Sequence, residues 1–148
     1  MDAVRDGLYV GEYSETLDTA LLAAHEIGAM LQLAEAVHHA GIVSLYLPVE
    51  DGEHLDPHLL RQGIDFVRDQ RRLGRSVLIA CGAGISRSPA FTVAVLREDE
   101  GLSLLEALRV VKNHNPVTMI HSALWESLCE FFHEEVSIRQ AMDVMISE

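Results

Sequence analysis

Residues 76 to 89 read Ser-Val-Leu-Ile-Ala-Cys-Gly-Ala-Gly-Ile-Ser-Arg-Ser-Pro, and this stretch is the most informative part of the chain. The apolar run over residues 76–80 is typical of a buried strand, and the residues that follow Pro89 have the pattern of a helix. Cys81 and Arg87 therefore bracket a turn from strand to helix. Such a turn points successive backbone N–H groups at one place, and the helix N-terminus adds positive potential there. The sequence thus predicts an oxyanion site in this loop.

The two bracketing side chains have complementary chemistry. The guanidinium of Arg87 would meet an oxyanion as a planar donor with two prongs. The same positive field would favour the thiolate of Cys81, which is its nucleophilic form. Gly82 and Gly84 permit positive φ and a close approach of the backbone to a ligand. One loop would therefore bind a dianion and direct a nucleophile at it, whereas the alternative is a buried cysteine with a structural role.

Composition limits the classes of function. The 148 residues suit one domain, residues 1–148, with a substantial core. The formal net charge of −12 argues against nucleic-acid or anionic-membrane partners, because both need positive patches. The two cysteines indicate no disulfide framework, the start has no signal-peptide pattern, and the longest uncharged run, 14 residues, is too short to span a bilayer. We therefore expect a cytoplasmic protein; the oligomeric state stays open.

Strand and helix patterns alternate in the first half of the chain. Three runs have the length and composition of strands: residues 8–11, 29–33 and 42–49. A helix is expected over residues 17–27. Another begins at Pro57, with Asp56 as its N-cap, and ends at Gly74.

Only helices are expected after residue 88. Ser103 and Glu106 have the spacing of a capping box, so a helix starts there. Asn115-Pro116 breaks that helix, and two more follow over residues 121–132 and 136–146. These patterns predict an α/β fold in which helices flank a central, mostly parallel sheet and the C-terminal half is helical. Ligands of such sheets bind at the carboxyl ends of the strands, where the cysteine loop would lie.

The loop resembles the signature loop of the cysteine-dependent protein tyrosine phosphatases and, among them, of the dual-specificity phosphatases. Residues 81–89, Cys-Gly-Ala-Gly-Ile-Ser-Arg-Ser-Pro, match it almost residue for residue. Weaker likenesses support it by order and spacing: residues 8–11 are similar to the opening strand, residues 49–51 to the general-acid loop, and residues 64–67 to the helix after it. The resemblance extends over residues 5–133 and implies a protein tyrosine phosphatase-like fold.

The resemblance implies a metal-independent protein phosphatase without a cofactor, which hydrolyses phosphotyrosine and phosphoserine or phosphothreonine in proteins or peptides. Cys81 would attack phosphorus in line and form a cysteinyl-phosphate intermediate. Ser88 would donate a hydrogen bond to the sulfur and make the thiolate a better leaving group; its other interpretation is a helix cap. The residues implied to bind phosphate are Gly82, Ala83, Gly84, Ile85, Ser86 and Arg87.

The general acid is expected at Asp51, which stands 30 residues before Cys81, directly after an apolar strand. It would protonate the departing oxygen and then, as a carboxylate, activate water against the phosphocysteine. Glu50, Glu53 and Asp56 compete for this role, although Asp56 is better explained as the helix cap.

Ala80 departs from the family pattern, which usually has His directly before the nucleophile. Because that imidazole helps to position the loop and to favour the thiolate, its absence predicts a slower or more alkaline first step. No aromatic-bearing recognition loop is evident, so a shallow pocket would admit phosphoserine and phosphothreonine as well as phosphotyrosine. The neutral residues 82–86 disfavour a lipid substrate. Asn115 either braces the phosphate loop or simply ends a helix.

Two rival functions remain. Ala80 favours a catalytically weak phosphoprotein-binding module, and a rhodanese-type sulfurtransferase also presents a cysteine at a strand end. The Arg-Ser-Pro ending and the acid loop fit a phosphatase better. His54 and His58 lie four residues apart, but a helix begins between them and no third ligand is evident, so we expect no metal site. Cys129 is expected to be a small buried hydrophobe.

Overall fold

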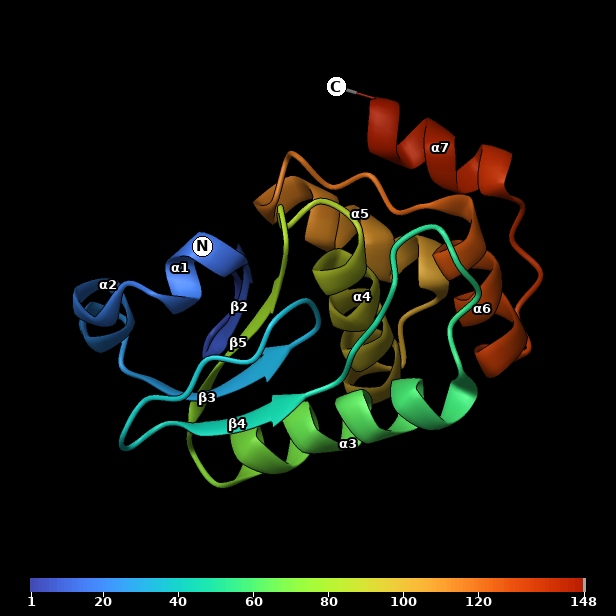
Figure 1. Cartoon of the computed structure of the whole chain (residues 1–148). Coiled ribbons are helices and arrows are strands. Elements are labelled where there is room, and N and C mark those ends of the chain that lie inside the picture. The colour runs from blue at the N-terminus through green and yellow to red at the C-terminus, as the bar shows by residue number, and fades with distance from the viewer. Residues whose placement is uncertain (148) are drawn as a thin grey trace.

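A five-stranded sheet lies at the centre of the computed structural model, which describes residues 1–147 (Figure 1). The strands in spatial order are β1 (Asp2–Arg5), β2 (Leu8–Glu12), β5 (Ser76–Cys81), β3 (Ile27–Gln32) and β4 (Val43–Tyr46). Only β1 and β2 pair antiparallel, and the other three pairs are parallel. The predicted fold class is therefore confirmed, and Cys81 ends the central strand.

Helices cover both faces of the sheet (Figure 1). The helices α3 to α7 are Pro57–Arg72, Arg87–Glu100, Leu104–His114, Ser122–Phe132 and Ile138–Ile146. Helices α3 and α4 pack against one face, α5 and α6 pack against α4, and α7 packs against α5 and α6. The short helices α1 (Tyr13–Thr16) and α2 (Thr19–Ala24) lie against the other face.

The alternation of side chains along β5 divides its residues between two cores. Val77, Ile79 and Cys81 belong to the large core beneath α3 and α4. Leu78 and Ala80 point to the smaller cluster under α2. The nucleophile candidate and the residue before it therefore face opposite sides of the sheet.

Several helix boundaries agree with the sequence signals. The Asp56 carboxylate accepts a hydrogen bond from the backbone N–H of His58 at 2.8 Å, and Pro57 opens α3. Ser103 and Glu106 form the expected capping box of α5. These motifs are local, so the chain beside each one fixes the outcome.

The helix expected over residues 17–27 is present but shorter, and both of its predicted ends are wrong. Only α2, Thr19–Ala24, lies in this range, since α1 ends before it and Ile27 already belongs to β3. Leu17 is exposed, and Asp18 starts α2 by accepting a hydrogen bond from the N–H of Leu21. Glu26 has a φ of 54°, which a continuing helix does not allow.

Three other boundaries differ from expectation. Strand β1 was not expected, because its short edge position leaves only Val4 buried; an Asp-Gly turn at residues 6–7 was the available signal. Strand β4 covers only Val43–Tyr46 of the run 42–49. Helix α4 begins at Arg87, two residues before the proline expected to open it.

Candidate active site

The loop between β5 and α4 turns its carbonyl groups outward. The carbonyl of Gly82 accepts a hydrogen bond from the N–H of Tyr13 at 3.2 Å, and that of Ile85 accepts one from Met119 at 2.7 Å. Within residues 1–147, none of the backbone N–H groups of residues 82–87 donates a hydrogen bond to another protein group. Six donors are thus left for a ligand at the start of a helix, as an oxyanion site requires.

Both glycines of the loop stand where a Cβ atom would be crowded. Gly84 has a φ of 72°, and a Cβ atom there would lie 3.1 Å from the carbonyl oxygen of Gly11. A Cβ atom at Gly82 would lie 3.0 Å from a terminal nitrogen of Arg87. The conformation of the first and the closeness of the second to the guanidinium both depend on the absence of a side chain.

Cys81 is 2% exposed, and its sulfur lies 3.2 Å from the hydroxyl oxygen of Ser88. The same hydroxyl lies 3.2 Å from the carbonyl oxygen of Gly11. Because a hydroxyl has a single proton, Ser88 can donate to only one of these two acceptors at a time. It can point to Gly11 while the sulfur is protonated and turn to the sulfur when a thiolate forms.

The guanidinium of Arg87 is held at one corner only. One of its terminal nitrogens donates to the carbonyl oxygen of Val49 at 2.9 Å. No carboxylate of residues 1–147 lies within 4.0 Å of it as an ion-pair partner. The contact ties the guanidinium to the segment before Asp51 and leaves its other N–H groups for a ligand.

The hydroxyl of Ser86 links Asp51 to the loop after β5. Ser86 donates to the Asp51 carboxylate at 2.8 Å and accepts a hydrogen bond from the N–H of His121 at 3.0 Å. Asp51 lines the same hollow, of about 440 Å³, as Cys81 and Arg87. The three competing acids, Glu50, Glu53 and Asp56, do not line it.

Asn115 has both of the roles considered from the sequence, since it ends a helix and braces the loop after β5. It is the C-cap residue of α5, and its buried side-chain amide donates to the carbonyl oxygen of Gly84 at 3.0 Å. The same amide donates to the hydroxyl of Thr118 at 2.9 Å. A segment 31 residues further along the chain therefore supports the glycine turn of the loop.

Ala80 borders a small hollow on the other side of the sheet, together with Tyr13, Gln32 and Glu35. A hydrogen bond with Glu35 raises the pKa of Tyr13. The methyl group of Ala80 offers no polar contact in this hollow. The slower or more alkaline first step expected from alanine in place of the usual histidine at position 80 stays a prediction.

Four large apolar residues of the hollow were not singled out from the sequence: Met119, Ile120, Ile138 and Met142. Ile138 and Met142 belong to α7, where their spacing of four residues was the only available signal. His121 lines the hollow too and is the N-cap of α6.

The residues set aside lie elsewhere. His54 approaches the carboxylate of Glu126 at 3.5 Å, and His58 is exposed. Within residues 1–147 no group of three or more His, Cys, Asp or Glu side chains is arranged to hold a metal ion. Cys129 is only partly buried; burial raises the pKa of its thiol, which donates to the carbonyl of Val136. Across the same residues, no helix combines the length and apolarity needed to cross a membrane.

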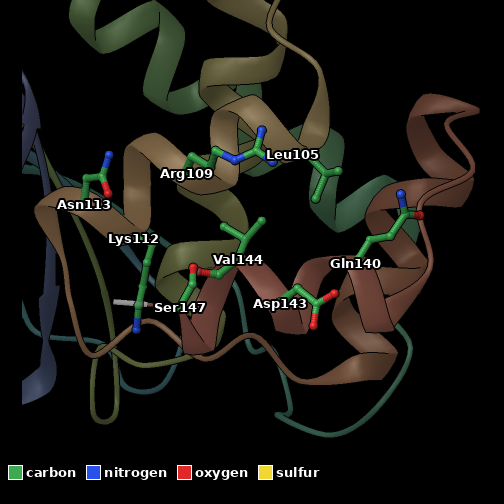
Figure 2. A pocket seen from close by; sticks show the side chains of 8 residues that line it. All are labelled: Leu105, Arg109, Lys112, Asn113, Gln140, Asp143, Val144 and Ser147. Carbon is green, nitrogen blue, oxygen red and sulfur yellow. The ribbon is translucent and has the colours of Figure 1, made fainter.

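A second hollow, of about 400 Å³, lies between α5 and α7 (Figure 2). Figure 2 shows the charged ends of Arg109 and Lys112 pointing to opposite sides of it. The ammonium of Lys112 already donates to the carbonyls of Pro116 and Thr118. The two cations do not converge on one point, so the loop after β5 is the better candidate for an anion site.

Comparison with known proteins gives a family match over most of the chain. The family model described as dual specificity phosphatase, catalytic domain, matches residues 8–134. Dual specificity protein phosphatase 1 of Arabidopsis thaliana is 30% identical over 118 residues, which cover 77% of this chain and 60% of that protein. Dual specificity protein phosphatase 5 of Rattus norvegicus is 29% identical over 131 residues, 86% of this chain and 34% of that protein. The chain thus spans less than two thirds of either relative.

Solved structures share the fold. Human DUSP28 superposes with a TM-score of 0.84 at 24% identity, over 90% of this chain and 96% of that one. A mouse protein assigned as a dual specificity phosphatase and complexed with zinc tungstate also gives a TM-score of 0.84. It is 26% identical, and the match covers 99% of this chain and 92% of that one.

Proposed function

The chain belongs to the dual-specificity phosphatase family of the protein tyrosine phosphatase superfamily, and from this premise we propose that it hydrolyses phosphate esters of proteins or peptides through a cysteinyl-phosphate intermediate. One observation carries the proposal above the others. The buried sulfur of Cys81 lies at the base of a loop whose N–H groups, with the guanidinium of Arg87, have no anionic partner among the described residues. A phosphate dianion would satisfy these donors and balance the charge of the guanidinium.

In the first step the thiolate of Cys81 attacks phosphorus, so an S–P bond forms as the P–O bond to the substrate breaks. Asp51 gives its proton to the departing oxygen, which leaves as an alcohol or phenol. The loop N–H groups and Arg87 hold the three non-bridging oxygens while charge moves through them. Asp51 ends this step as a carboxylate.

In the second step water attacks the phosphocysteine, and the carboxylate of Asp51 takes a proton from that water. The S–P bond breaks and inorganic phosphate forms. The sulfur departs as a thiolate, which the hydroxyl of Ser88 stabilises by turning its proton from Gly11 to the sulfur. Asp51 is then protonated again and the cycle is complete.

We propose phosphotyrosine and phosphoserine or phosphothreonine side chains as substrates. The family's name and the neutral side chains of residues 82–86 support this choice. The mouse relative supports an oxyanion ligand for this fold, because tungstate, like phosphate, is an oxyanion. Membership of the family also favours a phosphatase over a rhodanese-type sulfurtransferase.

Turnover of p-nitrophenyl phosphate in the presence of EDTA, across pH 5 to 8, tests the proposal. We expect activity that the chelator does not reduce. The Cys81→Ser variant should lose turnover yet still bind tungstate, as measured by calorimetry. Cys129→Ser is the matched control, since it removes the other thiol, and should keep its activity.

Two outcomes would contradict the proposal. An inactive wild-type protein that binds tungstate would favour the phosphoprotein-binding module. Transfer of sulfur from thiosulfate to cyanide, without phosphatase activity, would favour the sulfurtransferase.

A further inference from the structure

Helix α7 lies outside the region that the family model matches, yet it forms part of the catalytic hollow. The match ends at residue 134, and α7 covers Ile138–Ile146. Its residues Ile138 and Met142 line the same hollow as Cys81 and Arg87. This wall of the candidate site therefore lies outside the part of the chain that the family model describes.

The helix is held firmly in place. Ala141 and Met145 are buried in the large core, and the sulfur of Met145 lies 3.1 Å from the backbone nitrogen of Ile120, which donates to it. The segment before the helix is anchored as well, because the indole N–H of Trp125 donates to the carbonyl of Val136 at 2.9 Å. Ser137 then caps the helix. Since the face with Ala141 and Met145 is fixed in the core, the neighbouring face presents Ile138 and Met142 in a defined position.

The wall continues across the hollow as an apolar surface. Ile85 of the phosphate loop and Met119 of the segment after α5 are 39% and 36% exposed, and Met142 is 37% exposed. With Ile138, these three residues make up what we name the apolar wall: Ile85, Met119, Ile138 and Met142. Large apolar side chains that stay partly exposed beside reacting groups are typical of a binding site for an apolar ligand group.

The chemistry of the substrate decides which group meets this wall. When the phosphate lies in the loop, the atoms beyond the ester oxygen of phosphotyrosine form an aromatic ring. In phosphoserine they are one methylene group and then the polar peptide backbone. A ring gains from contact with aliphatic side chains and with the sulfur of methionine, whereas a peptide group against the same surface loses hydrogen bonds to water.

We propose that α7 completes an apolar wall that makes this site prefer phosphotyrosine over phosphoserine and phosphothreonine. The inference rests on the proposed phosphatase function and names its preferred substrate. The occupant is the phenyl ring itself, because the wall is continuous with the hollow that holds Cys81. Dual specificity is retained, with a bias between the two classes of ester.

Three peptides that differ only in the phosphorylated residue, each flanked by glycines, test the proposal. With such flanks, only the phosphorylated side chain can contact the wall. The measured quantity is the ratio of kcat/KM for the phosphotyrosine peptide to that for the phosphoserine or phosphothreonine peptide. We expect wild type to favour phosphotyrosine and Met142→Ala to lower the ratio by about tenfold, mainly through the phosphotyrosine term.

Ile146→Ala is the matched control. Ile146 lies four residues beyond Met142 on the same helix and is 60% exposed, but it does not line the hollow. Its removal should leave the ratio unchanged. Met142→Gln keeps the length of the side chain and should also lower the ratio, which covers the case in which the alanine variant unfolds.

The proposal is overturned if wild type shows no preference, if both Met142 variants keep the wild-type ratio, or if Ile146→Ala changes it equally. A loss of all turnover in wild type would instead contradict the proposed function. In that case binding of the same peptides to the Cys81→Ser protein, measured by calorimetry, decides the matter. The phosphotyrosine peptide should bind more tightly, and Met142→Ala should remove the difference.

Discussion

The charged and polar groups at the two ends of α4 differ in whether they have partners within the protein. At the N-terminal end, the first N–H groups have no partner among residues 1–147, and the N-cap residue Ser86 makes no capping hydrogen bond from its side chain. At the C-terminal end, Glu98, Asp99 and Glu100 all form ion pairs with arginines. Gly101 ends the helix there in a left-handed conformation.

We call the start of α4, at Arg87, its proposed binding end, and the ion-paired end at residues 98–100 its stabilising end. The chain has 23 acidic and 11 basic residues, so an arginine has many carboxylates available to it. Arg61, Arg68 and Arg71 of α3 bind the carboxylates at the C-terminal end, whereas the side chain of Arg87 makes its one hydrogen bond within residues 1–147 to the carbonyl of Val49. At the start of α4, the groups without a carboxylate partner among these residues are ones that an oxyanion would satisfy.

The N-cap of α4 also differs from the N-caps of most other helices. Five other helices begin with a side chain that accepts a hydrogen bond from their first turn: α2, α3, α5, α6 and α7. Helix α4 begins with a serine that is chemically able to do so, but its hydroxyl accepts a hydrogen bond from the N–H of His121 and donates to Asp51 instead. Ser86, a residue type that usually caps helices, therefore hydrogen-bonds within the candidate site, and the first N–H groups of α4 are left for a ligand.

The largest expected effect comes from replacing the unpaired arginine. Arg87→Lys keeps the charge but loses the planar fork, so kcat should fall by about 10³-fold while the thermal midpoint stays close to that of wild type. Steady-state kinetics and thermal unfolding measure the two quantities. Arg61→Lys, at the stabilising end, is the control and should keep the activity. Equal losses of activity in both variants would break the contrast between the two ends.

Replacing the acid should have the next largest effect. Asp51→Asn removes the proton donor, so kcat should fall by about 10²-fold for an alkyl phosphate. The loss should be smaller for p-nitrophenyl phosphate, because its leaving group departs without a proton. The variant Glu50→Gln serves as the neighbouring control. A loss of the same size for both leaving groups would remove Asp51 from this role.

A smaller effect is expected from Ser86, which acts through Asp51 and is therefore a positioning residue. Ser86→Ala breaks the link between the N–H of His121 and the Asp51 carboxylate and should lower kcat by about tenfold. The loss should depend on the leaving group in the same way as for Asp51→Asn. Ser86→Thr keeps the hydroxyl and should restore most of the rate. A uniform loss that threonine does not restore would indicate a structural role only.

The smallest effect concerns the stabilising end and appears as pH-dependent stability. The guanidinium of Arg61 hydrogen-bonds Glu98 and holds the pKa of that carboxyl below its usual range, with a further contribution from Arg68. The folded-state pKa is depressed, so the stabilisation is present above the unfolded-state pKa of about 4.3 and is lost as pH falls through the folded-state value.

Glu98→Gln should therefore lower the free energy of unfolding by about 1 kcal/mol at pH 7, because the pair is partly exposed. The difference from wild type should shrink as the pH falls below about 4.3 and through the folded-state pKa. Urea unfolding at several pH values measures this, and the exposed Glu53→Gln is the control. A difference that does not shrink with falling pH would show that the ion pair is not its source.

Local motifs explain what was predictable. The strand before Cys81, the glycine turn, the cap of α3 and the capping box of α5 are each set by a few adjacent residues, and the structure agrees with all of them. The helix expected over residues 17–27 is shorter than predicted, because Asp18 caps α2 at its start and the left-handed Glu26 does not continue it. Side-chain periodicity over one short segment did not carry enough information to place these two ends.

The sequence alone determined the phosphate loop, its nucleophile and arginine candidates, and a parallel sheet with β5 at its centre, because adjacent residues and their periodicity encode these features. Tertiary structure alone decided that Asp51, rather than its acidic neighbours, lines the hollow with Cys81. It also decided that Ser86 holds Asp51, that Asn115 braces Gly84, and that α7 supplies an apolar wall. The Ser86–Asp51 and Asn115–Gly84 hydrogen bonds join residues 35 and 31 positions apart, and only the packing of separate elements brings such groups together.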